Sequence, residues 1–126
     1  MIIIVVQDLL LKQSLHRALR RMDVESIFLT TIIEADNLIK NNHDAIEAVI
    51  IDFDIDPESN RKYLLGTMKD GYDMRILVYR DLPNPYLSEN LLSLKNIQFK
   101  EKPFMLEDII SILQQNQGGK NVSLSI

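Results

Sequence analysis

The amino-acid sequence predicts an α/β fold in which one parallel sheet carries helices on both faces. Short aliphatic runs alternate along the chain with segments whose apolar residues recur at helical spacing, the pattern of strand–helix–strand units. The runs Ile2–Val6 and Ala48–Ile51 contain no polar residue, as expected of strands buried on both faces. Because crossovers between parallel strands are right-handed, few arrangements of such units remain possible.

Five strands and five helices are predicted in alternation. The strands are placed at residues 2–6, 26–30, 48–51, 75–79 and 97–100, and the helices at 9–22, 32–40, 61–69, 86–94 and 106–115. In the first helix, Leu11, Leu15 and Leu19 recur every four residues and form one apolar face. Thr31, or its neighbour Thr30, is predicted to cap the second helix, with Glu34 completing a capping box. Residues 54–60 are predicted to form a polar loop.

Size and composition exclude several classes of protein. At 126 residues the chain fits one domain, placed at residues 1–117, with 118–126 as a tail or the start of a linker. The absence of cysteine excludes disulfides and thiolate metal sites. No apolar run approaches the roughly 18 residues that a membrane span needs, so we expect a cytoplasmic protein without membrane contact. A net charge of -4 argues against direct nucleic-acid binding.

Carboxylates follow two of the predicted strands at the point where each strand ends. Asp8 comes after the first strand, and Asp52 ends the buried run at residues 48–51. A flavodoxin-like, doubly wound sheet has the strand order 2-1-3-4-5, in which the first and third strands are neighbours. Ligands of open α/β sheets bind at the carboxyl ends of the strands, where the strand order reverses. We therefore expect Asp8 and Asp52 to converge at a functional site.

With Lys102-Pro103-Phe104 after the last strand, these residues make the chain similar to the receiver domains of bacterial response regulators, from Ile2 to about Gln115. The resemblance implies that Asp52 is a phosphoacceptor in two-component signalling. By position, Gln7 and Asp8 correspond to the pair of acidic residues that follows the first strand of a receiver domain. Arg80 corresponds to the hydroxyl residue after the fourth strand, and Phe99 to the aromatic residue that switches on activation. Phe99 is better explained as an ordinary core residue than as a working switch.

The resemblance also implies the chemistry of the site. Mg²⁺ would be bound by the Asp8 and Asp52 carboxylates and by the main-chain carbonyl of Asp54, since Mg²⁺ prefers oxygen ligands. Lys102 would pair with the phosphoryl oxygens, and the Lys102–Pro103 peptide bond is expected to be cis. The domain is expected not to be an enzyme beyond self-catalysed phosphoryl transfer to Asp52.

The resemblance also suggests partners. They are a sensor histidine kinase or a phosphotransfer protein, a second copy bound through the fourth and fifth strand–helix units, and a fused or separate output domain. Each would meet the domain through protein–protein contacts, and phosphorylation would switch those contacts.

Two departures from the receiver pattern leave the function open. Gln7 replaces a carboxylate with a neutral amide, so Mg²⁺ is expected to bind weakly. Arg80 replaces a serine or threonine, and it can either clamp a phosphoryl group or pair permanently with Asp52, Asp54 or Asp8. The bulky Asp81 follows it. The alternative function is therefore a pseudo-receiver, a protein-interaction or dimerisation module that acts without phosphorylation. A flavin or nucleotide binder is disfavoured because no glycine-rich phosphate loop follows the first strand.

Overall fold

The computed structural model describes residues 1–70, 73–81 and 96–114, with the backbone alone described over 67–70. Its centre is a five-stranded sheet in the order β2-β1-β3-β4-β5, and every neighbouring pair of strands is parallel. The strands are β1 (Ile2–Val5), β2 (Ser26–Leu29), β3 (Ala48–Asp52), β4 (Arg75–Arg80) and β5 (Ile97–Glu101). The predicted flavodoxin-like strand order is therefore confirmed.

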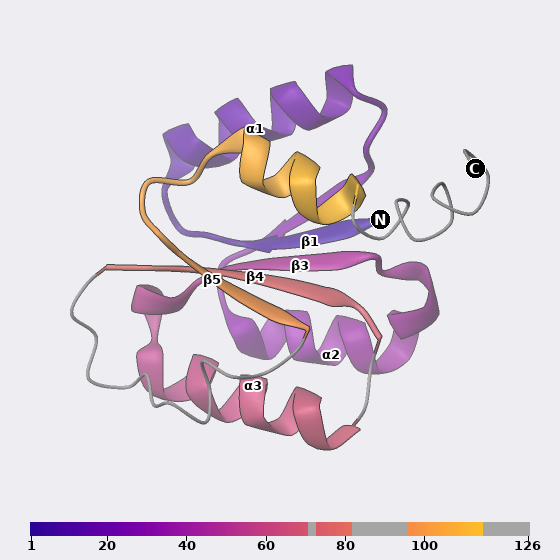
Figure 1. The fold of residues 1–126 in the computed structure, drawn as a ribbon, viewed down its shortest axis with the longest axis vertical. Helices are drawn as coiled ribbons and strands as arrows, with labels where there is room; N and C mark the ends of the chain where they lie inside the picture. Colours follow the sequence, from indigo (N-terminus) through magenta and orange to yellow (C-terminus); the bar gives the residue numbers. More distant parts are fainter. Residues whose placement is uncertain (71–72, 82–95, 115–126) are drawn as a thin grey trace, which may run out of the picture.

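Helices cover both faces of this sheet (Figure 1). The labelled helices are α1 (Leu9–Arg21), α2 (Ile32–Asn42) and α3 (Pro57–Asp70), and residues 106–114 are also helical. Short 3-10 turns lie at η1 (His43–Ala45) and η2 (Phe53–Ile55). One face carries α1 and the helix over 106–114, and the other carries α2 and α3. The predicted helix at 86–94 and the tail at 118–126 fall outside the described residues.

The two central strands explain why the aliphatic runs are uninterrupted. Along β1, Ile3 and Val5 pack into the core on the side of α2 and α3, whereas Ile2 and Ile4 pack on the side of α1. All four side chains are at most 1% exposed. Because successive side chains of a strand point to opposite faces, burial of both faces requires an apolar residue at every position. Among the described residues, no helix is long and apolar enough to span a membrane.

Side-chain caps fix the starts of α1 and α2 at the carboxyl edge of the sheet. The Asp8 carboxylate accepts a hydrogen bond from Leu11 N at 3.1 Å. Thr31 Oγ1 accepts from Glu34 N at 3.2 Å and donates to Glu34 Oε1 at 3.0 Å, so the predicted cap at Thr31 is confirmed. Hydrogen bonds from the Thr30 and Thr31 hydroxyls lower the pKa of the Glu34 carboxyl.

The start of α3 is a correction to the sequence-based prediction. Residues 54–60 were expected to form a loop that ran up to a helix at Arg61, but η2 and the first turn of α3 occupy this segment. Asp56 Oδ1 accepts a hydrogen bond from Ser59 N at 3.2 Å, as a capping residue does. Pro57 is then the first helical residue, where its fixed φ and missing N–H cost nothing.

We expect Leu19→Ala to destabilise the domain by about 2–5 kcal/mol, because this side chain is fully buried and its loss leaves a cavity. Leu10→Ala is the matched control on the same helix, since Leu10 is 77% exposed and should change the free energy of unfolding by no more than about 0.5 kcal/mol. Urea denaturation of both variants measures the difference. Equal effects would contradict the packing described for α1.

Candidate functional site

The candidate site lies at the carboxyl edge of the sheet, where β3, β4 and β5 end side by side. Asp52 is the last residue of β3, and its register partner on β4 is Tyr79. The following turn η2 bends back so that Asp54 N donates to Asp52 Oδ1 at 3.1 Å. The Asp52 side chain is 18% exposed. The Asp52 carboxylate thus sits at the rim of the core and still reaches solvent.

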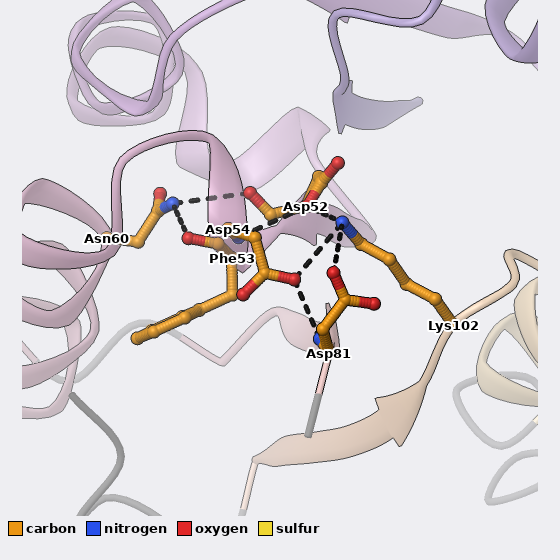
Figure 2. Close-up of polar contacts among 6 residues, drawn as sticks. All are labelled: Asp52, Phe53, Asp54, Asn60, Asp81 and Lys102. Carbon is orange, nitrogen blue, oxygen red and sulfur yellow. Dashed lines mark hydrogen bonds and ion pairs between the residues drawn. The ribbon is translucent and has the colours of Figure 1, made fainter. Parts of the chain in front are cut away.

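The Lys102 ammonium occupies the centre of this site (Figure 2). Its Nζ lies 2.8 Å from Asp52 Oδ1 and 3.1 Å from Asp54 Oδ2. Lys102 follows β5, and its N–H donates to Arg80 O at 3.1 Å. The Lys102–Pro103 peptide bond is cis, as the resemblance implies. The structure therefore brings Asp52 and Lys102 together from strands that are far apart in the sequence.

Two carboxylates take part in ways that the sequence analysis missed. The Asp54 side chain had been considered only as a partner of Arg80, yet it binds Lys102 and accepts from Asp81 N at 2.7 Å. The Asp81 carboxylate lies 3.9 Å from Lys102 Nζ. A signal was present, because acidic residues follow both β3 and β4, and those two strands are neighbours.

Asn60 is a second residue that the sequence analysis missed. It lies on the first turns of α3 and is 2% exposed. Its Nδ2 donates to Phe53 O at 2.9 Å and to Asp52 O at 3.3 Å, so it holds the backbone on which the Asp52 carboxylate is mounted. Sequence periodicity gives no signal for such a contact, because an asparagine on a helix is usually exposed.

The site holds three carboxylates and one ammonium within contact distance. Burial lowers the pKa of Lys102, but hydrogen bonds and charges from Asp52 and Asp54 outweigh it, so the pKa of Lys102 is raised above its usual 10.5. The ammonium stays charged at neutral pH. An acceptor carboxylate with a fixed cation beside it is suited to chemistry that gathers negative oxygens, such as phosphoryl transfer.

The remaining predicted residues are placed differently. Gln7 Nε2 donates to Thr30 O at 3.3 Å and so ties the end of β1 to the end of β2. Arg80 Nε and Nη1 are buried without a hydrogen-bond partner. Among the described residues Arg80 forms no ion pair with Asp52, Asp54 or Asp8, so the permanent pair considered above is not formed. Phe99 packs partly buried against the core on the α2 and α3 side, which is consistent with an ordinary core residue.

The oxygen donors fit the chemistry of Mg²⁺, which binds carboxylate and carbonyl oxygens. Asp8 and Asp52 follow neighbouring strands at one edge of the sheet, and negative charge exceeds positive charge in the Lys102 cluster. Over the described ranges, no three acidic, histidine or cysteine side chains form a ready-made metal cluster. The Mg²⁺ ligands that the resemblance implies include only two carboxylates, those of Asp8 and Asp52, and the third ligand would be the main-chain carbonyl of Asp54.

Comparisons with known proteins leave the family open. No protein-family model matches the chain, and no curated protein matches its sequence. The similarity to receiver domains therefore rests on the residues and on the strand order alone, and a fold by itself does not fix a function.

We expect Lys102→Met to lower the free energy of unfolding at neutral pH by on the order of 1 kcal/mol, because Asp52 and Asp54 lose their shared cation. The raised pKa gives the sign of the pH dependence. The stabilisation is complete below pH 10.5, the unperturbed value, and is lost as the pH rises through the higher folded-state pKa. Urea denaturation of both proteins near pH 7 and above pH 10.5 should show the difference shrinking.

Lys62→Met is the control for that prediction, because Lys62 forms an exposed ion pair with Glu58 at 3.5 Å. Its removal should change stability by less than about 0.5 kcal/mol at any pH. If the two lysine variants behave alike, Lys102 does not hold the acidic cluster together.

Proposed function

We propose that this domain is a cytoplasmic, receiver-type signalling module that accepts a phosphoryl group on Asp52 from a sensor histidine kinase or a phosphotransfer protein. The observation that carries the proposal is the Lys102 Nζ position, 2.8 Å from Asp52 Oδ1 at the carboxyl edge of a 2-1-3-4-5 sheet. The acceptor and the cation that such a transfer requires lie in contact.

The two oxygens of Asp52 have different surroundings, and this suggests which one reacts. Oδ1 accepts hydrogen bonds from Lys102 Nζ and Asp54 N. Among the described residues, Oδ2 has no hydrogen-bond partner, and no dashed contact reaches it in Figure 2. In the proposed step, Oδ2 attacks phosphorus and forms the O–P bond while the P–N bond of the donor phosphohistidine breaks. The electron pair of that bond leaves with the imidazole, which then takes up a proton.

Charge is the main obstacle to this step. The incoming phosphoryl oxygens approach a cluster that already contains the Asp54 and Asp81 carboxylates. Lys102 offsets part of the repulsion, because its ammonium can turn from Asp54 toward the phosphoryl oxygens without losing Asp52 Oδ1. When bound, Mg²⁺ would neutralise further charge on those oxygens. Asp8 would hold it on the side of β1.

Switching would follow from the same exchange of partners. Phosphorylation adds charge and new acceptor oxygens at Asp52, so Lys102 is drawn away from Asp54. Asp54 Oδ2 also holds Asp81 N at 2.7 Å, and Asp81 directly follows β4. The proposed output is a rearrangement that begins at the end of β4 and changes protein–protein contacts, including contacts with a second copy or with an output domain.

A pseudo-receiver is the second candidate, and the ion-pair geometry favours it in one respect. Lys102 already pairs with both Asp52 and Asp54 in the unphosphorylated chain, so a cation of the chain itself holds this edge together. In that case Asp52 is a structural partner of Lys102, and the domain binds other proteins constitutively.

We expect incubation with a small-molecule phosphodonor and Mg²⁺ to add one phosphoryl group to the wild-type chain, as detected by intact-mass spectrometry, and to add none to Asp52→Asn. Asp56→Asn is the matched control, because Asp56 is an exposed carboxylate on the neighbouring turn and should leave the adduct unchanged.

Arg80→Thr separates the two candidates in the same assay. If the wild-type chain gains no adduct and Arg80→Thr gains one, Arg80 blocks the site and the pseudo-receiver is favoured. If neither protein gains an adduct under conditions in which both remain folded, Asp52 is not a phosphoacceptor.

A further inference from the structure

Tyr79 connects strand β4 to the segment after β5 that carries Lys102. It is on β4, directly beside Asp52 in the sheet register, and it is fully buried on the face covered by α1 and the helix over 106–114. A buried phenol needs partners for its hydroxyl, because an unpaired polar group in the core is costly. The partners of Tyr79 all lie in the segment that follows β5.

The Tyr79 hydroxyl contacts two residues of this segment. It donates to Asp108 Oδ2 at 2.6 Å and accepts from Met105 N at 3.1 Å. Its ring stacks on Phe104 with the ring centroids 4.1 Å apart. Burial, together with the hydrogen bond to Asp108, raises the pKa of Tyr79, so the phenol remains a donor across the physiological range.

These contacts hold the turn that carries Lys102. At its start, Lys102 N donates to Arg80 O at 3.1 Å. At its end, Met105 N donates to the Tyr79 hydroxyl. The last two residues of β4 therefore anchor both ends of the segment Lys102–Met105.

We propose that Tyr79 is a positioning residue that aims the Lys102 ammonium at Asp52 and Asp54. The importance of this positioning for phosphoryl transfer rests on the proposed function. The positioning of Lys102 by Tyr79 does not depend on that function. A lysine side chain has four rotatable bonds and loses much rotamer freedom when its Nζ is held in one place. Contacts of 2.8 and 3.1 Å to two carboxylates need the backbone of Lys102 to be fixed, and Tyr79 provides part of that fixation.

The hydroxyl is the decisive group. Phenylalanine at this position keeps the ring that stacks on Phe104 but removes the acceptor for Met105 N and the donor for Asp108. The far end of the turn would lose its anchor on β4, while the near end at Arg80 O would remain. Lys102 Nζ would then sample positions away from the carboxylates, and small displacements of a charge-stabilising group reduce transfer rates strongly.

The test is the order parameter of the Lys102 Cε methylene, measured by ¹³C NMR relaxation at neutral pH in the wild-type chain and in Tyr79→Phe without phosphodonor. We expect a lower order parameter in the variant, because Nζ is no longer held 2.8 and 3.1 Å from the two carboxylates. Tyr63→Phe is the matched control. Tyr63 is also buried, but it packs on the opposite side of the sheet and should leave the Lys102 order parameter unchanged.

A pair of substitutions at Asp108 tests the same contact if Tyr79→Phe does not fold. Asp108→Asn removes the charge but keeps an acceptor for the Tyr79 hydroxyl, whereas Asp108→Ala removes both. A larger fall in the Lys102 Cε order parameter for alanine than for asparagine supports the proposal, and equal falls overturn it. An unchanged order parameter in folded Tyr79→Phe also overturns it. The expected fall in a protein that never accepts phosphate would refute the proposed function and leave this inference standing.

Discussion

The Lys102 ammonium between the Asp52 and Asp54 carboxylates is the interaction on which the carboxyl edge of this domain depends. Two neighbouring strands, β3 and β4, end in three acidic residues, and Lys102 Nζ lies within 3.9 Å of a carboxylate oxygen of each. The fixed cation offsets part of the repulsion among these carboxylates. The 2-1-3-4-5 order brings the end of β3 beside β4, and β4 beside β5. The same order that buries the aliphatic core thus delivers Lys102 to Asp52 across about fifty residues of sequence.

Hydrogen bonds from neighbouring residues hold the Lys102 ion pairs in place. Asn60 fixes the main chain at Asp52 and Phe53, and Asp81 N fixes the Asp54 carboxylate. On the other side of the sheet, the Tyr79 hydroxyl secures the turn after Lys102. A receiver and a pseudo-receiver require this same framework. They differ in whether Asp52 Oδ2 is reactive, and therefore in how Arg80 and Gln7 modify the approach of a phosphoryl group and a metal ion.

The fold was largely predictable because its signals are local. Uninterrupted apolar strands such as Ile2–Val5 fit a sheet that is covered on both faces. Thr31, with Glu34 three residues later, marks the start of a helix. The start of α3 was also encoded locally, by Asp56 and Pro57, but the polar composition of that segment favoured a loop. The Asn60 and Tyr79 contacts could not be predicted, because each depends on backbone atoms brought close only by the tertiary fold. The Asp54 and Asp81 side chains were partly predictable. Their positions after two strands could be predicted from the sequence, but their orientation toward Lys102 could not.

The central claim is that Asp52 and Lys102 form a site for a phosphoryl group. Its most direct test is to add Mg²⁺ with fluoroberyllate, a stable mimic of a phosphoryl group bound to a carboxylate, and to follow amide resonances by NMR. We predict saturable shifts centred on Asp52, Asp54, Asp81 and Lys102 that are abolished in Asp52→Asn. Spectra that remain unchanged in the wild-type chain at saturating fluoroberyllate would contradict the claim and leave Lys102 as a structural counter-ion.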